Sequence, residues 1–141
     1  MAFLIKEELK TVAQIPLIDK IINMDNEIVD NIIEESISLI KSYLSRYYDV
    51  DAIFIAEGNE RHKGILKRLK DIVIYEVYER HTREQNEVAM RRYSEALNWL
   101  EKLNTGEFGD KTLPKIPDND APDGTTGGVR FGGNKRFDSI Y

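Results

Sequence analysis

The stretch from Ile72 to Tyr78, which reads IVIYEVY, decides the predicted fold of this 141-residue chain. Every residue in it is aliphatic or aromatic except Glu76. A helix that is apolar on nearly every side is buried on several sides, so we expect this helix at the centre of the molecule. It is predicted to run from a cap at Asn59 to about Arg80.

A long amphipathic helix is predicted before this central one, from about Glu27 to Tyr47. Its apolar residues recur at three- and four-residue spacing and form a broad stripe. Asp25 or Asn26 is expected to cap it, because both side chains accept hydrogen bonds from free N–H groups at a helix start.

The last predicted helix opens with a capping box formed by Thr82 and Gln85. It runs to about Asn104, and Gly106 follows at a position where a left-handed residue ends many helices. Because the connections between helices of this length are short, neighbouring helices are expected to be antiparallel.

The other segments of the body are predicted to be short. A helix is expected near Leu4–Val12, and Pro16 beyond it opposes continuation. Both Ile15–Ile22 and residues 48–58 are expected as loops, the second one packed on the body through its Ile53–Phe54–Ile55 run. The predicted fold class is therefore all-α: a compact bundle of three main antiparallel helices plus a short N-terminal helix, with a long extended C-terminal arm.

The composition changes after residue 104, which predicts two regions. Residues 1–104 are predicted to form a helical domain, and residues 105–141 an extended, Gly/Pro-rich C-terminal docking arm that holds three of the four prolines. Aromatic and arginine side chains are typical anchors of protein interfaces. The alternative is a disordered tail with incidental aromatics. The predicted anchors at the tip of the arm are Arg130, Phe131, Arg136, Phe137 and Tyr141.

Signals of catalysis are weak, so no enzyme is predicted. The chain has no cysteine, which excludes disulfides and thiol chemistry. The two histidines, His62 and His81, are far apart and are expected to face solvent; a metal site would need both of them plus carboxylates. No catalytic, cofactor-binding or metal-ligating residue is predicted. No apolar run approaches the roughly 20 residues that span a bilayer, and no secretory signal is seen, so we expect synthesis in the cytoplasm.

Charge is unevenly distributed along the chain, whose net charge is −5. Residues 1–60 carry 5 Lys or Arg against 12 Asp or Glu, whereas residues 61–92 carry 9 against 5. Head-to-tail packing of copies would bring acidic and basic regions together, and complementary potentials favour such contacts. The alternative is a solvated helical surface with uneven charge.

Four segments resemble one known family, the neck proteins of Mu-like phages, which are small helical connectors of the head–tail junction. Leu69–Arg80 (LKDIVIYEVYER) is similar to their central helix, and Arg92–Lys102 (RYSEALNWLEK) to their last helix. Ser42–Tyr47 (SYLSRY) resembles the end of their earlier helix, and Val129–Arg136 (VRFGGNKR) the ending that some members carry.

The resemblance implies a structural protein of the virion, located at the head–tail junction and made in the host bacterium. It implies a ring of subunits, commonly twelve, stacked on the portal protein and bridging to the tail or a tail-adaptor protein. The arm would reach a neighbouring subunit or the portal protein, and DNA would pass through the ring without specific binding. The resemblance implies no catalysis, cofactor or membrane.

A different class of function stays open, that of a small nucleic-acid-binding or regulatory helical module. A run of basic residues on the central helix could follow phosphates, and a salt-sensitive affinity for DNA would support this function. The acidic remainder of the chain argues against it. The basic run consists of Arg61, Lys63, Lys67, Arg68 and Lys70.

Overall fold

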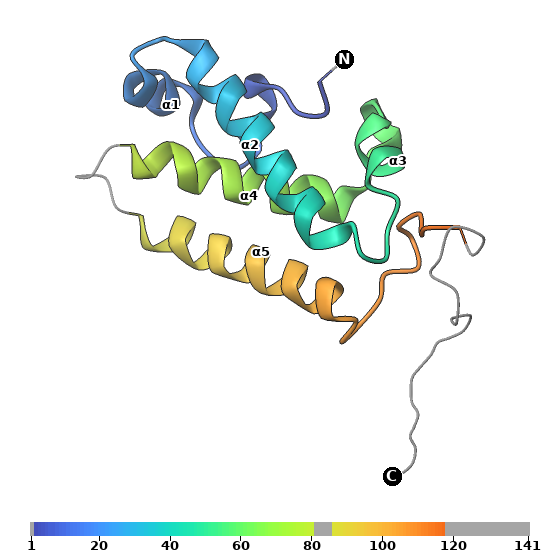
Figure 1. Cartoon of the computed structure of the whole chain (residues 1–141). Helices are drawn as coiled ribbons and strands as arrows, with labels where there is room; N and C mark the ends of the chain where they lie inside the picture. The colour runs from blue at the N-terminus through green and yellow to red at the C-terminus, as the bar shows by residue number, and fades with distance from the viewer. Residues whose placement is uncertain (1, 81–85, 118–141) are drawn as a thin grey trace.

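A computed structural model describes residues 2–80 and 86–117, and these ranges contain helices and no strand. Three long helices dominate: α2 (Asn26–Leu44), α4 (Lys63–Glu79) and α5 (Glu87–Thr105). α4 and α5 run antiparallel side by side, while α2 crosses this pair obliquely and contacts both helices (Figure 1). The predicted all-α fold, a compact bundle built on three main helices, is confirmed.

The IVIYEVY stretch lies in the second half of α4, which is the central helix as predicted. Ile72, Val73 and Val77 are each at most 1% exposed, because α4 packs against α1, α2 and α5. The predicted cap at Asn59 is wrong. His62 caps the helix instead, with its Nδ1 accepting a hydrogen bond from the backbone N–H of Ile65 at 3.2 Å.

The ends of α2 and α5 follow the same local chemistry. Asp25 caps α2 by accepting from the N–H of Glu27, as expected. The predicted capping box of Thr82 and Gln85 lies outside the described residues, and α5 begins at Glu87 with Asn86 as its cap.

Gly106 ends α5, as predicted, in a left-handed conformation with φ of 79°. A Cβ added there would lie 3.3 Å from the hydroxyl of Tyr47, so the position favours glycine through both its backbone angle and the close approach of that ring.

Two segments expected as loops are helices. Ile15–Ile22 forms α1, in which Pro16 stands at the start rather than beyond an end; proline lacks only an N–H that is unpaired there anyway. Val50–Ile55 forms α3. Ile53 is buried as expected, but Ile55 is 77% exposed.

The N-terminal segment forms η1, a 3-10 helix over Lys6–Thr11, in place of the helix expected near Leu4–Val12. Leu4 and Leu9 are at most 1% exposed and join the single hydrophobic core of the body. In the described ranges, no helix has the length and apolar content needed to cross a membrane.

Candidate functional site

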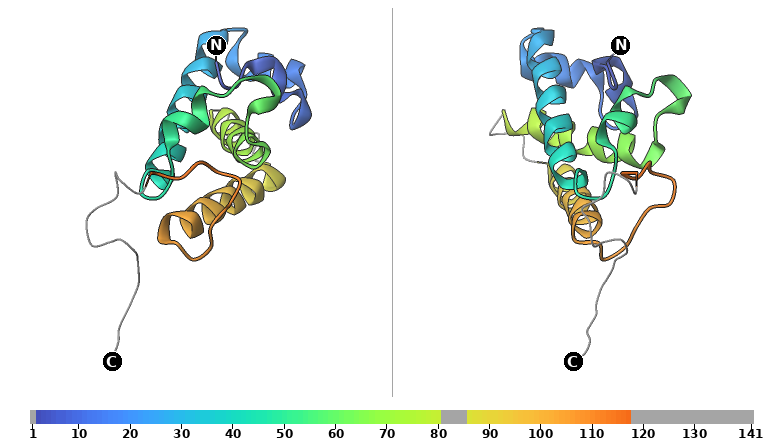
Figure 2. Two further views of the ribbon diagram at one scale, coloured as in Figure 1. Left: turned by 90° about the vertical axis from the view of Figure 1, so that its right-hand side faces the viewer. Right: turned by 45° about the vertical axis from the view of Figure 1, so that its right-hand side comes forward.

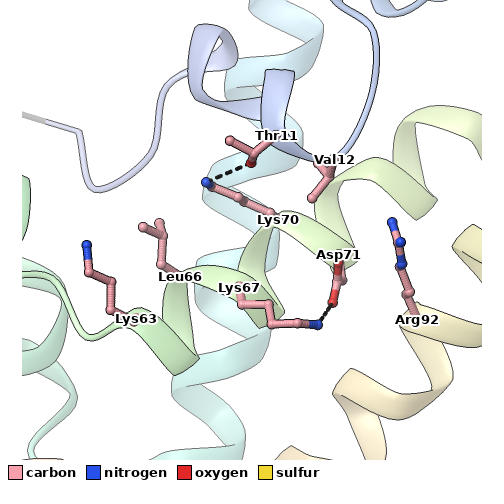
Figure 3. Close-up of a pocket in the computed structure, with 8 residues that line it drawn as sticks. All are labelled: Thr11, Val12, Lys63, Leu66, Lys67, Lys70, Asp71 and Arg92. Atoms are coloured by element: carbon pink, nitrogen blue, oxygen red, sulfur yellow. Dashed lines mark hydrogen bonds and ion pairs between the residues drawn. The ribbon is translucent and has the colours of Figure 1, made fainter.

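A basic pocket of about 510 Å³ opens between η1, α4 and α5. Its three lysines belong to α4, and Arg92 belongs to α5 (Figure 3). Residues three and four apart share one face of a helix, which is why Lys63, Lys67 and Lys70 stand in a row. The basic pocket is lined by Thr11, Val12, Lys63, Leu66, Lys67, Lys70, Asp71 and Arg92.

One buried carboxylate opposes the four cations of the basic pocket. The Asp71 side chain is only 2% exposed and pairs with Nζ of Lys67 at 3.0 Å, whereas the Lys67 side chain is 58% exposed. A buried carboxylate requires such a partner, so this pair is structural. It leaves the remaining positive charge of the pocket uncompensated by any residue that lines it.

The other cations have few local partners. Nζ of Lys70 donates to the hydroxyl of Thr11, a neutral group, at 3.0 Å. Lys63 and Arg92 are exposed, and neither forms an ion pair or hydrogen bond with another residue in the described ranges. The pocket can therefore hold an anion with groups that the fold does not otherwise use.

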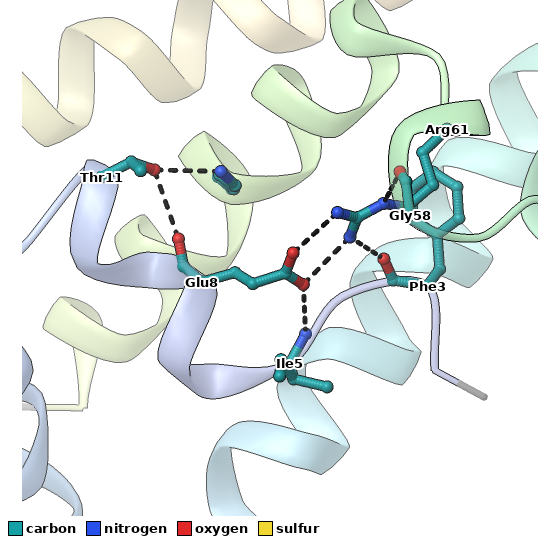
Figure 4. A network of polar contacts seen from close by, with 7 residues as sticks. Phe3, Ile5, Glu8, Thr11, Gly58 and Arg61 are labelled. Carbon is teal, nitrogen blue, oxygen red and sulfur yellow. Dashed lines mark hydrogen bonds and ion pairs between the residues drawn. The ribbon is translucent and has the colours of Figure 1, made fainter.

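Two members of the predicted basic run do not reach this pocket. Arg61 binds both carboxylate oxygens of Glu8, at 2.7 and 3.0 Å, and the carbonyl O of Phe3 at 2.7 Å (Figure 4). Arg68 lies over the ring of Trp99, with its Cζ 5.1 Å from the ring centroid. Sequence reasoning also missed Arg92, which the antiparallel packing of α5 on α4 brings to the same site.

An acidic stripe runs along α2, formed by Glu27, Asp30 and Glu34. All three side chains are exposed, and none pairs with a cation in the described part of the chain. No residue of α2 lines the basic pocket. Within the described body, the acidic stripe and the basic pocket are therefore separate surfaces of opposite charge.

Carboxylates of α2 and α4 also act on one another and on a tyrosine of α5. Burial, and then the nearby carboxylates of Glu79 and Glu35, raise the pKa of Glu76. The ring of Tyr93 stacks on that of Tyr75 with centroids 3.9 Å apart. Burial, followed by the charge of Glu76, raises the pKa of Tyr93.

The segment after α5 returns to the body and forms a strap over residues 110–116. Figure 2 shows it running from the end of α5 to the turn between α2 and α3. The N–H of Asp49 donates to the carbonyl of Pro114 at 2.9 Å, and the N–H of Ile116 donates to that of Tyr47 at 3.2 Å. Leu113 is 3% exposed, so the strap contributes to the core.

A polar cluster fixes the beginning of the strap. Asp110 accepts hydrogen bonds from the backbone and hydroxyl of Thr112, and its backbone N–H donates to the hydroxyl of Tyr48 at 3.1 Å. Burial alone would raise the pKa of Asp110, but the Thr112 hydrogen bonds and nearby His62 hold it below its usual value.

The histidines were expected to face solvent, and for His62 this is wrong. Its side chain is 19% exposed, caps α4, and has Nε2 2.6 Å from the Thr112 hydroxyl. His81 lies outside the described residues. In the described ranges, no three His, Cys, Asp or Glu residues are grouped as a metal site would require.

The predicted interface anchors belong to the tip of the C-terminal arm. They lie outside the described residues, which end at Pro117. Their role as interface anchors stays a prediction. These anchors are Arg130, Phe131, Arg136, Phe137 and Tyr141.

Comparison with known proteins identifies a family for this chain. The model of a family described as "Bacteriophage Mu, Gp36" matches residues 4–120, which include the helical body and the whole strap. No curated protein and no solved structure matches the chain.

Proposed function

This chain belongs to the bacteriophage Mu Gp36 family, and we propose that it is a head–tail connector, a subunit of the neck ring of a tailed phage. Membership of the family makes it a bacteriophage protein and supports a structural role. In the proposed role, the ring stacks on the portal protein and bridges to the tail or a tail-adaptor protein. The subunits are made in the host cytoplasm and end at the head–tail junction of the virion.

The single observation that carries the proposal is the family match over residues 4–120, which spans most of the chain. The two charged surfaces add physical support. A ring needs heterologous contacts, in which each subunit offers two different surfaces to its two neighbours. The basic pocket and the acidic stripe are two such surfaces on one body.

The proposal gives the C-terminal arm a docking role. The strap, residues 110–116, is the part of the predicted arm that packs on the body, so the rest of the arm would start from a defined place near the end of α2. An arm that orders on binding gives up chain entropy in exchange for a wide contact area, and repetition around a ring adds avidity. Its tip is proposed to bind a neighbouring subunit or the portal protein.

No catalytic step, cofactor or metal forms part of this proposal, and DNA would cross the ring lumen without specific contacts. The basic pocket offers cations for binding an anion, and in the proposed role its side chains recognise the charge of a partner. The nucleic-acid-binding alternative loses support because Arg61 and Arg68 are engaged within the body.

Quantitative mass spectrometry of purified particles tests the proposal. The chain is counted against the portal protein after particles are separated from free protein. We expect about one copy per portal subunit, since stacked rings of matched symmetry bury equivalent surfaces. Absence of the chain from particles that are otherwise complete would overturn the connector role.

A further inference from the structure

We infer that the basic pocket is the docking site for the acidic stripe of a second copy of this chain. The inference rests on the proposed ring and names the two surfaces that meet between neighbouring subunits. Charge complementarity between surfaces of one chain carries it.

The basic pocket contains cations that are available to bind carboxylates. Lys63 and Arg92 are exposed and have no partner in the described ranges, and Lys70 contacts only a neutral hydroxyl. The buried Asp71 offsets a single cation. A concave site with an excess of one sign of charge attracts groups of opposite charge.

The acidic stripe is the matching surface. Glu27, Asp30 and Glu34 lie within about 60° of one another around α2, since each residue turns an α-helix by about 100°. They have no cationic partner in the described body. Because no α2 residue lines the pocket, the contact is made between copies, in which each subunit gives its stripe and receives that of its neighbour.

The spacing of the two rows sets a register. Lys63, Lys67 and Lys70 are separated by four and then three residues; Glu34, Asp30 and Glu27, read backwards, show the same spacing. Both rows span about 10 Å of helix. An antiparallel approach of α2 to α4 of the neighbour therefore places Lys63 opposite Glu34 and Lys70 opposite Glu27.

A protein partner fits these observations better than nucleic acid. The chain carries a net charge of −5, and an acidic total disfavours binding to a phosphate backbone. Two of the five basic residues that would follow phosphates are bound inside the molecule, Arg61 to Glu8 and Arg68 over Trp99. The acidic stripe, by contrast, presents carboxylates in a row that matches the lysines.

Cross-linking in particles tests the contact directly. The chain has no cysteine, so introduced cysteines are the only thiols in it. A variant with Lys63→Cys and Glu34→Cys is incorporated into phage particles and treated with a short bis-maleimide. We expect a ladder of linked subunits on a denaturing gel, because each subunit contributes one thiol to each of two contacts.

A matched control pairs Lys63→Cys with Glu101→Cys, an exposed residue of α5 outside both surfaces. This variant should give no ladder. Particles that contain the Lys63/Glu34 variant would support the connector role in either case. The docking inference is overturned if neither pair cross-links in them, or if only the control pair does. If the chain is absent from complete particles, the connector role fails, and the same cross-linking of the concentrated purified protein decides the docking contact.

Charge reversal gives a second test with a rescue. Lys63→Glu with Lys70→Glu reverses the pocket without removing Lys67, the partner of Asp71, and Glu27→Lys with Glu34→Lys reverses the facing residues of the stripe. Each pair should lower incorporation into particles about tenfold or more, since like charges then face each other. The variant with all four changes should recover most of the loss, and failure to recover, with the variant folded by circular dichroism, would contradict the contact.

The matched control here is Lys20→Glu with Glu101→Lys, which alters exposed residues of the same types elsewhere. It should assemble as the wild type does. A stripe-reversed chain that assembles normally, with a pocket-reversed chain that instead loses affinity for DNA in a salt-dependent way, would assign the pocket to phosphate and overturn the inference.

Discussion

Nη2 of Arg61 lies 2.7 Å from Oε2 of Glu8 and joins the N-terminal 3-10 helix to the residue before the cap of α4. The same guanidinium donates to the carbonyls of Phe3 and Gly58 (Figure 4). The Arg61 side chain therefore joins the N-terminal segment around Phe3 and Glu8 to the turn before α4. The stability of the N-terminal segment should depend on it.

Replacement of Arg61 by methionine should lower the free energy of unfolding by about 1–2 kcal/mol, because it removes charge-assisted hydrogen bonds that partial exposure to solvent weakens. Urea unfolding followed by circular dichroism measures the change. Arg91→Met is the matched control, since Arg91 is exposed and should change stability by less than about 0.5 kcal/mol. Equal effects of the two substitutions would contradict the prediction.

Acid should weaken this N-terminal contact. The hydrogen bond from Arg61 lowers the pKa of Glu8 below its ordinary value of 4.5. The folded state therefore binds the proton less readily, and the stability gained is present above 4.5 and lost as pH falls through the lowered pKa. The stability difference between wild type and Glu8→Gln should shrink between about pH 6 and pH 3. A difference that stays constant over this range would contradict it.

The ionised carboxylate of Glu76, unlike that of Glu8, should destabilise the folded state. Burial and the carboxylates of Glu79 and Glu35 raise its pKa, so its ionised form costs stability at neutral pH and protonation relieves that cost as pH falls. Glu76→Gln should therefore stabilise the protein at pH 7, by less than about 1 kcal/mol because solvent screens these charges. Thermal unfolding at pH 7 measures it, with exposed Glu101→Gln as the control; a lower melting temperature for Glu76→Gln would refute the assignment.

Leu113→Ala should loosen the strap. Leu113 is 3% exposed, and removing its buried side chain costs about 2 kcal/mol. The amides of Asp49 and Ile116, whose hydrogen bonds join the strap to the body, should then exchange with solvent deuterium faster, because local opening becomes easier. Lys115→Ala, at an exposed strap position, should leave both exchange rates unchanged, and unchanged rates in Leu113→Ala would oppose this role.

Two truncations should separate folding from assembly. A chain ending at Pro117 keeps the strap and every residue of the described core, so its stability should match that of the full chain within about 0.5 kcal/mol. It should fail to enter particles, because it lacks the predicted anchors. A chain ending at Gly109 also loses Leu113 and should unfold more easily. Normal particle assembly by the first truncation would exclude the docking role of the arm.

Two helices that were predicted as loops show the limit of prediction from local sequence patterns. Ile15–Ile22 and Val50–Ile55 are too short for their periodicity to distinguish a helix from a packed loop. Burial against the rest of the body stabilises α1 as a helix, since Ile18 and Ile22 are at most 1% exposed. Pro16 was expected to oppose continuation of the preceding helix, and it stands in the first turn of α1, where no N–H is needed.

The basic site could be predicted only in part. The spacing of Lys63, Lys67 and Lys70 places them on one helix face from sequence alone. The same run suggested Arg61 and Arg68, but their partners come from distant segments. Glu8 is 53 positions away from Arg61, and no local pattern reports such a contact.

By itself, the sequence determined the all-α class, the central helix, the end of α5 at Gly106 and the separation of charge along the chain. These features depend on contacts within a few residues or on the apolar stripe of one helix. Only the tertiary structure decided which cations share a pocket, that Arg92 completes it, and that residues 110–116 belong to the body. Those results depend on how α5 packs on α4 and where the strap returns, because packing joins residues that are remote in sequence.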